Sequence, residues 1–553
     1  MVKVEEGRRV TGRVFAIALL LAGALSPLQA QGSGHGFATA IDTLVREMPN
    51  EEMALRRLYT LAAQRPLWLS HGGPTPQTLA AITFIDSAAR RGLRPEAYGI
   101  DTLHSLFAAS AEPDSADGFD SLRLAAIDVA LSRSLLQLLA DLGHGQVDPA
   151  SVGLELPSRP ERDLASIVLA ASQSDDVARV LETVEPPYAG YAALLRLLAR
   201  YRALAADTTL TLSRDEPTVR PNDLYADAPR LRKLLAALGD LSPHAAYTEP
   251  NRYAGALVLA VMHFQRRHGL TSDGTIGPST WAALRVPLAT RVRQIELALE
   301  RWRWLPPRAP ARYVVVNIPA FRLYAFENDS AAAQPVLSMN VVVGEAGRQH
   351  DTPVFVSEMR EVVFRPYWDV PPRIARTELV PAIKRGELDM ESEGYEIVSA
   401  GDRPRVYRVT RANLDRVAAG TLHIRQRPGQ GNALGLVKFV FPNEHDVYLH
   451  GTPAVKLFSF ARRDFSHGCI RAEQPAALAG FVLTDDSTWN RAAIEAAMHG
   501  RETLHVPLAQ PVTVFILYMT TVVAPDGTPY FYPDLYGEDA KVERVLGQLP
   551  NER

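Results

Sequence analysis

The chain changes its pattern of hydrophobic positions twice, and the first region has the period of helices. From residue 36 to 212, apolar residues recur at three- and four-residue steps, as on one face of an α-helix. The clearest run, 121–142, has apolar residues at Leu124, Ile127, Leu131, Leu135, Leu138 and Leu142. Asp120 or Ser121 can cap its start and Gly143 its end. We therefore expect a helical scaffold domain over residues 36–212. No role is assigned to its scattered polar residues His104, Asp128 and His144.

A second region follows a proline-rich, charged stretch at residues 213–229, which we interpret as a linker. Three short helical patterns come after it, at residues 230–238, 254–267 and 280–284. The turn before the third helix contains Asp-Gly and Gly-Pro, which suit a tight turn and a proline at a first helical position. These patterns predict a small three-helix module over residues 230–290.

From Arg312 onwards the period becomes that of strands. Short β-branched runs are separated by Gly, Pro, Asn or Asp. We expect a β-rich catalytic domain over residues 312–510 and a C-terminal extension over 511–553. A polar insertion at about 371–430 contains a predicted helix at 373–385, and an insertion of this size is typical of a lid. The predicted fold class is thus multidomain α+β.

Composition narrows the classes of function. The 553 residues contain 59 Lys and Arg and 62 Asp and Glu, a net charge of −3, which argues against nucleic acid as a partner. The single cysteine, Cys469, excludes an intramolecular disulfide framework and a cysteine-rich zinc module. Composition alone favours a buried, inert thiol.

The first thirty residues have the pattern of a secretory signal peptide, with basic residues before a short apolar run that begins at Val14. Small-residue processing after Ala30 would release a mature chain outside the cytoplasm. A signal anchor is the alternative, although the run of about a dozen residues is shorter than the roughly twenty that span a bilayer. An unpaired thiol is unusual in an oxidising compartment, and this favours a chemical role for Cys469.

Around Cys469 the residue types suit thiol chemistry. His450 ends a predicted strand in which Tyr448 and His450 share one face. If the Ser466–Arg471 loop folds over that face, His450 can take the thiol proton and later return it. Nearby imidazole and guanidinium groups are expected to lower the thiol pKa. Gly468 lets the backbone approach closely, so the amides of Gly468 and Cys469 are candidates for an oxyanion hole.

Two segments resemble known families. Residues 264–281, with Phe264–Leu270, Asp273-Gly274 and Thr280-Trp281, resemble the small three-helix peptidoglycan-binding module of wall enzymes. His450 followed by Ser466-His-Gly-Cys469 resembles the L,D-transpeptidase family with the YkuD-type catalytic domain. With the helical front half, the chain is similar to the large multidomain subgroup of Gram-negative envelopes.

The resemblance implies roles for particular residues. Cys469 would be the nucleophile, His450 the base and acid, and the Gly451 carbonyl the group that orients His450. The residues expected to shape the pocket and oxyanion site are Ser466, His467, Gly468 and Arg471. Many relatives have Asn in place of Arg471, so its contact stays open. Candidates for substrate binding are Tyr367, Trp368 and Tyr448, although aromatic packing explains the first two equally well.

The implied reaction is acyl transfer between peptidoglycan stems without a metal or organic cofactor. Cys469 would attack the bond between diaminopimelate and D-Ala, and the thioester would pass to a second stem's diaminopimelate amine. Water or a lipoprotein lysine are other possible acceptors. The implied location is the periplasm, peripheral to the membrane at most, with peptidoglycan as the partner.

Two other classes stay open on the residues alone. A zinc-dependent wall hydrolase would use the two histidines and Cys469 as ligands. A non-catalytic wall-anchoring protein would rely on the helical half and the module. Sensitivity to thiol alkylation rather than to chelators would distinguish the first of these from acyl transfer.

Overall fold

The computed structural model describes residues 35–49, 52–70, 73–110, 121–157, 160, 162–213, 217–247, 249–327, 334–401 and 403–548. The expected signal peptide at residues 1–30 lies outside the described residues. The chain divides into two compact units: residues up to 147 with 160–186 and 543 onwards, and residues 148–159 with 187–542. No described helix is both long and apolar enough to cross a membrane.

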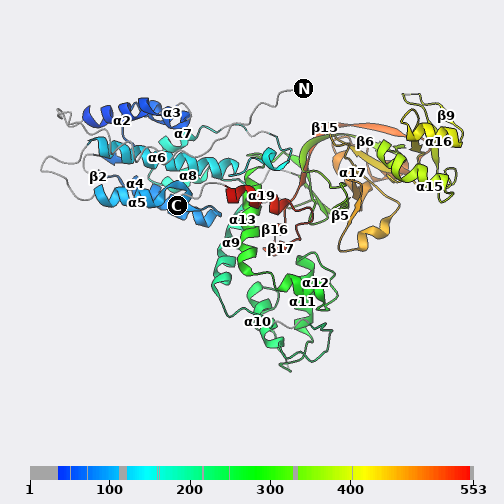
Figure 1. Cartoon of the computed structure of the whole chain (residues 1–553), viewed down its shortest axis with the longest axis horizontal. Helices are drawn as coiled ribbons and strands as arrows, with labels where there is room; N and C mark the ends of the chain where they lie inside the picture. The colour runs from blue at the N-terminus through cyan, green and yellow to red at the C-terminus, as the bar shows by residue number, and fades with distance from the viewer. Residues whose placement is uncertain are drawn as a thin grey trace. The chain divides into compact units, whose positions relative to one another are not determined.

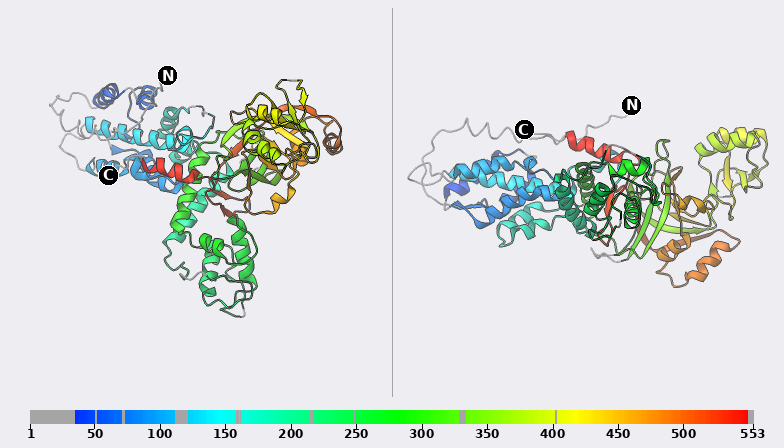
Figure 2. Two further views of the ribbon diagram at one scale, coloured as in Figure 1. Left: turned by 45° about the vertical axis from the view of Figure 1, so that its right-hand side comes forward. Right: turned by 90° about the horizontal axis from the view of Figure 1, so that it is seen from below.

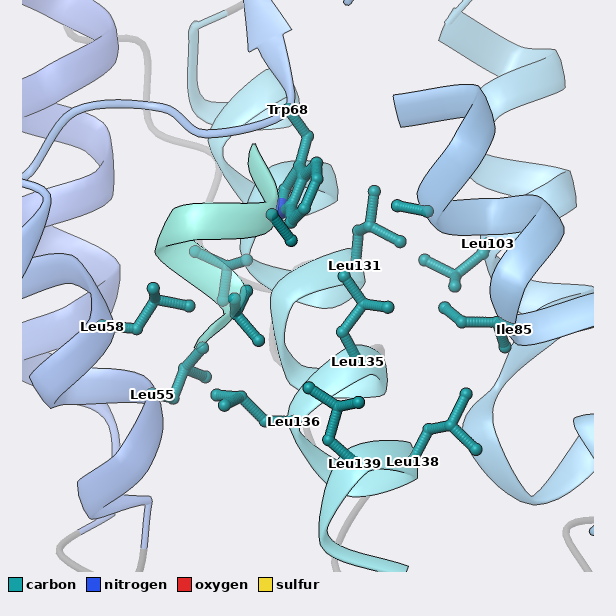
Figure 3. Packing of buried hydrophobic residues seen from close by; sticks show 14 of the residues in the cluster. Leu55, Leu58, Trp68, Ile85, Leu103, Leu131, Leu135, Leu136, Leu138 and Leu139 are labelled. Atoms are coloured by element: carbon teal, nitrogen blue, oxygen red, sulfur yellow. The ribbon is translucent and has the colours of Figure 1, made fainter. Parts of the chain in front are cut away.

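The first unit is helical, as the sequence predicts. The long helix α6 (Ser121–His144) places the buried side chains of Leu131, Leu135 and Leu138 between neighbouring helices (Figure 3). The elements around it are α2 (His35–Glu47), α3 (Met53–Leu61), β1 (Leu69–Ser70), β2 (Gly73–Pro74), α4 (Pro76–Asp86), α5 (Ile100–Ser110), α7 (Leu164–Ser172) and α8 (Val177–Glu182), with 3₁₀ turns η1 (Ser87–Arg91) and η2 (Pro95–Tyr98).

Gly143 does not end helix α6. It is buried inside the last turn, and a Cβ atom there would lie 2.9 Å from Cγ1 of Val184. The helix ends at His144, and Gly145 after it has a φ of 87°. The predicted helix end is therefore wrong by two residues, because Gly143 is needed for close packing rather than for the left-handed turn.

Asp128, which received no role from the sequence, organises the core of this unit. Its carboxylate is fully buried and accepts hydrogen bonds from the backbone amides of Leu67, Trp68 and Leu69. The Tyr59 hydroxyl also donates to it at 2.6 Å. Burial raises the pKa of Asp128. Because one side chain satisfies four donors in an apolar core, it fixes the 67–69 segment onto α6.

The second unit begins with helices. The elements are η3 (Pro149–Val152), α9 (Ala189–Ala206), α10 (Ala228–Leu238), α11 (Ala256–Arg267), α12 (Pro278–Leu284) and α13 (Leu288–Arg303) (Figure 1). Helices α10 to α12 correspond to the three predicted helices of the module. Helix α9 was expected in the scaffold, but it packs on α13 within this unit.

The described part of the predicted linker is packed on the module. Val219 is buried and exchanges backbone hydrogen bonds with Ile276. The Trp281 ring nitrogen donates to the carbonyl oxygen of Pro217 at 2.8 Å. The residues from 217 onwards therefore pack against the module and do not act as a flexible linker. The proline content of the segment could not reveal this, because the contacts join residues that are distant in sequence.

A nine-stranded sheet forms the centre of this unit. Its strand order is β13-β5-β14-β12-β11-β6-β15-β3-β4, and β4 also pairs with β5, so eight strands close on themselves. The strands are β3 (Arg312–Asn317), β4 (Arg322–Glu327), β5 (Leu337–Gly344), β6 (Phe355–Phe364), β11 (Val437–Val440), β12 (Leu449–His450), β13 (Asp464–Ser466), β14 (Ile470–Ala472) and β15 (Leu504–Leu517). Closure leaves few free strand edges. The turn η5 (Val455–Ser459) and helices α17 (Pro475–Val482) and α18 (Arg491–His499) complete this part.

The C-terminal residues 511–553 do not form a separate extension throughout. Strand β15 crosses the expected boundary at residue 510, and Val512, Val514 and Ile516 are fully buried between β3 and β6. The chain then forms the hairpin β16 (Thr521–Val523) and β17 (Pro529–Phe531), followed by α19 (Glu538–Gln548). Phe531 belongs to the core of the helical module, with its ring 5.2 Å from that of Tyr201.

The insertion is a folded subdomain with its own core, and Figure 2 shows it as a separate lobe beside the sheet. Its strands pair in the order β7-β10-β8-β9. The predicted helix at 373–385 is present, with a π-helical turn in its middle. The elements are β7 (Trp368–Asp369), α14 (Pro372–Ile374), η4 (Ala375–Leu379), α15 (Val380–Lys384), β8 (Tyr395–Val398), β9 (Val406–Tyr407), α16 (Arg411–Ala418) and β10 (His423–Gln426).

We expect Asp128→Ala to destabilise the helical unit by roughly 3 kcal/mol, because four buried donors lose their acceptor. Calorimetry of the full chain would show this as a lower melting temperature of one transition. Asp175→Ala is the matched control, since Asp175 is exposed and bonds to no described residue. Equal melting temperatures for the two variants would contradict the role of Asp128.

Candidate active site

Strand pairing brings the predicted site residues together. Strands β12 and β14 are parallel neighbours, with Leu449 beside Ile470 and His450 beside Arg471. Because alternate residues of a strand share a face, Tyr448 and His450 lie on the same face as Cys469 and Arg471. The rings of Tyr448 and His450 are 5.7 Å apart, as the alternation predicts.

His450 is a buried, neutral imidazole. Its Nδ1 donates a hydrogen bond to the carbonyl oxygen of Gly451 at 2.6 Å, which leaves Nε2 as the proton acceptor. Burial lowers the pKa of His450 to about 3, and the positive charge of Arg471 contributes. The carbonyl groups of Gly451 and Leu434 act in the opposite direction. His450 is only 4% exposed, so folding removes it almost entirely from water although it lies at the end of a strand.

Cys469 carries a half-buried thiol whose pKa is raised. Burial is the main cause, and it outweighs the groups that favour the thiolate, namely the backbone amide and hydroxyl of Tyr448, Lys438 and Arg471. Sγ lies 3.7 Å from the carbonyl oxygen of Asp446. The predicted lowering of the thiol pKa is therefore not observed. Loss of hydration destabilises the thiolate by more than the two nearby cations stabilise it.

Lys438 is a site residue that the sequence analysis missed. It faces His450 from the neighbouring strand β11, and its Nζ lies 3.9 Å from the centre of the Tyr448 ring. Burial lowers the pKa of Lys438, and it also lowers the pKa of Arg471. Among the described residues neither cation forms an ion pair, and Nε of Arg471 is buried without a hydrogen-bond partner. The available signal was a lysine between the apolar residues Val437 and Phe439 in a predicted strand, which turns it to the face opposite theirs.

The loop before Cys469 is held by a buried hydroxyl network. The Ser466 hydroxyl donates to the carbonyl oxygen of Cys469 at 2.6 Å and accepts from the Gly468 amide at 3.2 Å. Thr352 donates to the Gly468 carbonyl at 2.8 Å and accepts from the Gly344 amide at 2.9 Å. This network holds Gly468 at a φ of 119°, a conformation that favours glycine.

The expected oxyanion hole is altered by this network. The Gly468 amide is already bonded to Ser466, whereas the Cys469 amide makes no hydrogen bond to any described residue. The Cys469 amide therefore stays available to a developing oxyanion. A Cβ atom at position 468 would meet only ordinary contacts, the nearest at 3.7 Å, so backbone conformation rather than close approach requires the glycine.

Tyr536, from the C-terminal segment, supports the same loop. Its hydroxyl donates to the carbonyl oxygen of Gly344 at 2.7 Å and accepts from the Thr352 amide at 3.3 Å. Sequence analysis gave neither Tyr536 nor Thr352 a role, because Tyr536 and the Gly468 carbonyl that Thr352 binds are each more than a hundred residues from their partners. The C-terminal segment thus helps to hold the catalytic loop in place.

His467 faces the inserted subdomain. Its Nε2 lies 2.9 Å from Oε1 of Glu378 in η4, and its ring centre lies 4.5 Å from that of His350. No contact between the His467 ring and Cys469 is found in the described part of the chain. Of the two histidines expected beside the thiol, only His450 shares its face.

Trp368 and Tyr367 differ in their contacts. The Trp368 ring lies 6.3 Å from the Tyr395 ring of the insertion, and Trp368 is close enough to Tyr448 to act against the burial that raises the pKa of the Tyr448 hydroxyl, so it joins the insertion to the catalytic face. The guanidinium of Arg425 stacks on the Tyr367 ring at 4.3 Å, and that ring is partly exposed. Trp368 thus belongs to the first strand of the insertion and Tyr367 directly precedes it, and their role in substrate binding stays a prediction.

The residues do not assemble into a metal site. Among the residues that the structure describes, no three His, Cys, Asp or Glu side chains converge as ligands. His450 Nδ1 is bonded to a carbonyl oxygen, and His467 is paired with Glu378. The ligand set that a zinc hydrolase would need is therefore not formed by these residues.

Three segments of the chain match known protein families. Residues 311–512 match the L,D-transpeptidase catalytic domain, YkuD. Residues 226–284 match the family described as "Putative peptidoglycan binding domain", and residues 53–198 match the "Scaffold domain" family. The chain therefore carries a YkuD-type L,D-transpeptidase catalytic domain together with a peptidoglycan-binding domain and a helical scaffold, and the predicted fold class is confirmed.

One relative has a matching name. A protein of Haemophilus influenzae named "Putative L,D-transpeptidase" is 29% identical over 232 residues, which are 41% of this chain and 45% of the relative. The similarity thus covers less than half of either protein.

We expect the Cys469 thiol to react slowly with iodoacetamide at neutral pH, because only the thiolate is the nucleophile and burial disfavours it. The rate should still rise above about pH 9, beyond the usual thiol pKa near 8.5. As the chain has one cysteine, the label is unambiguous. Lys438→Met should move the midpoint higher still, and a wild-type plateau below about pH 7 would contradict the raised pKa.

Proposed function

We propose that this protein is a cysteine-dependent L,D-transpeptidase that links peptidoglycan stems through diaminopimelate. The observation that carries the proposal is the pairing of β12 with β14, which sets the His450 imidazole and the Cys469 thiol on one face of the sheet. The match of residues 311–512 to the L,D-transpeptidase catalytic domain supports it.

In the first step, the Cys469 sulfur attacks the carbonyl carbon between diaminopimelate and the terminal D-Ala. The thiol proton passes to Nε2 of His450, and the Cys469 amide stabilises the oxyanion. When the C–N bond breaks, His450 returns the proton to the leaving D-Ala amine. The product is a thioester on Cys469 with both side chains neutral again. Since both groups are neutral at rest, proton transfer accompanies attack rather than preceding it.

In the second step, the side-chain amine of another stem's diaminopimelate attacks the thioester. His450 removes a proton from that amine and delivers it to the departing Cys469 sulfur, so a new amide forms and the thiol is restored. The insertion borders this site through Trp368 and the Glu378–His467 contact. A cover that excludes water favours the amine as acceptor.

The charges of the site support a carboxylate-bearing donor. Lys438 and Arg471 are partly buried cations, and neither forms an ion pair with a described residue. Such cations are stabilised when an anionic ligand arrives. A stem peptide supplies carboxylates on diaminopimelate and D-Ala. A bound carboxylate would also offset two charges that lower the pKa of His450, which makes it a better proton acceptor.

The proposed location is the cell wall, in the periplasm after removal of the signal peptide. The matching peptidoglycan-binding domain over residues 226–284 supports peptidoglycan as the partner. A non-catalytic anchoring protein would need the same domain, but it would not need the thiol, the imidazole and two cations together on one face.

Mass spectrometry of the purified protein with disaccharide-tetrapeptide tests the reaction. We expect an acyl adduct on Cys469, release of D-Ala and a cross-linked product, with no adduct on Cys469→Ala. His450→Gln preserves most of the buried volume and should slow acylation by about a hundredfold or more. A Cys469→Ala protein with full cross-linking activity would overturn the proposal. Acylation of His450→Gln at the wild-type rate would show that His450 is not the base.

The role of the two cations is tested with donor stems that have free or amidated carboxylates. Lys438→Met should lower kcat/KM for the free-carboxylate donor by about tenfold or more, because a charged hydrogen bond is lost. The amidated donor should lose much less. Lys456→Met is the control, since Lys456 is exposed on η5. Equal losses on both donors would show that Lys438 does not recognise a carboxylate.

A further inference from the structure

The larger unit contains a groove that the reaction does not use. It has a volume of about 660 Å³. One wall is the loop of the peptidoglycan-binding domain over residues 269–280, and the other is the segment 460–465 before the catalytic loop. Pro533 and Leu535 of the C-terminal segment also line it. The groove is therefore shared by the binding domain and the catalytic domain.

The catalytic wall presents two exposed aromatic rings. Phe460 is 53% exposed and Phe465 is 42% exposed, and their rings meet edge to face at 5.8 Å. Large apolar side chains that remain exposed inside a groove are typical of ligand sites. Exposed rings of this kind offer flat faces on which the apolar C–H faces of sugar rings can stack.

The opposite wall offers neutral hydrogen-bonding groups. The hydroxyls of Thr271 and Ser279 are exposed and bond to no described residue. Arg462 is paired with Asp464 at 2.6 Å, so Asp273, whose carboxylate accepts from the Thr275 amide at 2.8 Å, leaves one negative charge at the groove. Aromatic faces opposite hydroxyls and a single carboxylate, all of which can hydrogen-bond to sugar hydroxyls, suit a carbohydrate better than an acidic peptide.

We propose that this groove binds a segment of the glycan strand of peptidoglycan, held between the binding domain and Phe460 and Phe465. The inference rests on the proposed function, because it places the polymer that carries the donor stem. The groove then selects polymeric substrate over soluble fragments.

The distance to the nucleophile fits this arrangement. Phe465 precedes Cys469 by four residues, so their Cα atoms are at most about 14 Å apart. An extended stem of three residues spans roughly 10 Å, and the lactyl link to the sugar adds to this reach. A stem attached to a sugar beside Phe465 is therefore of comparable length to the separation from Cys469.

Sedimentation of the full chain with purified insoluble peptidoglycan tests the groove. Phe460→Ala should weaken binding by about five- to tenfold, and Phe460→Trp should restore it. Thr271→Ala with Ser279→Ala, on the other wall, should also weaken it. Leu79→Ala is the control, because Leu79 is 68% exposed and lies outside both the groove and the matched binding domain. If Phe460→Ala binds peptidoglycan as tightly as the wild type does, the proposal is overturned. It is also overturned if only the Thr271 and Ser279 substitutions weaken binding.

Competition identifies the ligand. Glycan chains stripped of their stems should displace the protein from insoluble peptidoglycan, whereas free stem peptides should not. Displacement by stems alone would overturn the glycan assignment. Phe460→Ala should also lower the ratio of activity on polymeric substrate to activity on disaccharide-tetrapeptide. If the wild-type protein has no activity on the soluble donor, the proposed function fails. The binding experiments still show whether the groove binds glycan.

Discussion

The site depends on the register between two short parallel strands. With Leu449 beside Ile470 and His450 beside Arg471, the imidazole, the thiol and the guanidinium share one face of the sheet. A shift of one residue would turn either set to the opposite face, because side chains alternate along a strand. The buried network of Ser466, Thr352 and Tyr536 holds the intervening loop and thereby protects this register.

Burial and charge set the resting protonation of the pair. The pKa of Cys469 is raised and that of His450 is lowered, both mainly because charged forms lose hydration. The site thus holds a neutral thiol and a neutral imidazole, unlike a preformed thiolate–imidazolium pair. Two cations, Lys438 and Arg471, lie near them, and neither forms an ion pair within the described part of the chain. An anionic substrate completes the charge balance, so the chemistry is coupled to the presence of the donor.

The C-terminal segment connects parts of the larger unit that the sequence separates. Strand β15 lies between β3 and β6, Tyr536 supports the catalytic loop, and Phe531 enters the core of the binding domain. These contacts fix the catalytic and binding parts against each other within the unit. They also form part of the groove in which we place the glycan strand.

Local pattern was sufficient for the helices, the strands, the insertion and the Cys469–His450 motif, because period, turn residues and motif spacing depend on neighbours in sequence. The sequence did not reveal the roles of Asp128, Lys438 and Tyr536, since each acts through partners that only folding brings near. It also placed the end of the catalytic sheet at residue 510, although β15 continues to Leu517. Tertiary structure likewise decided the direction of the Cys469 and His450 pKa shifts. Both shifts come mainly from burial, and burial depends on segments that are distant in sequence and packed around each side chain.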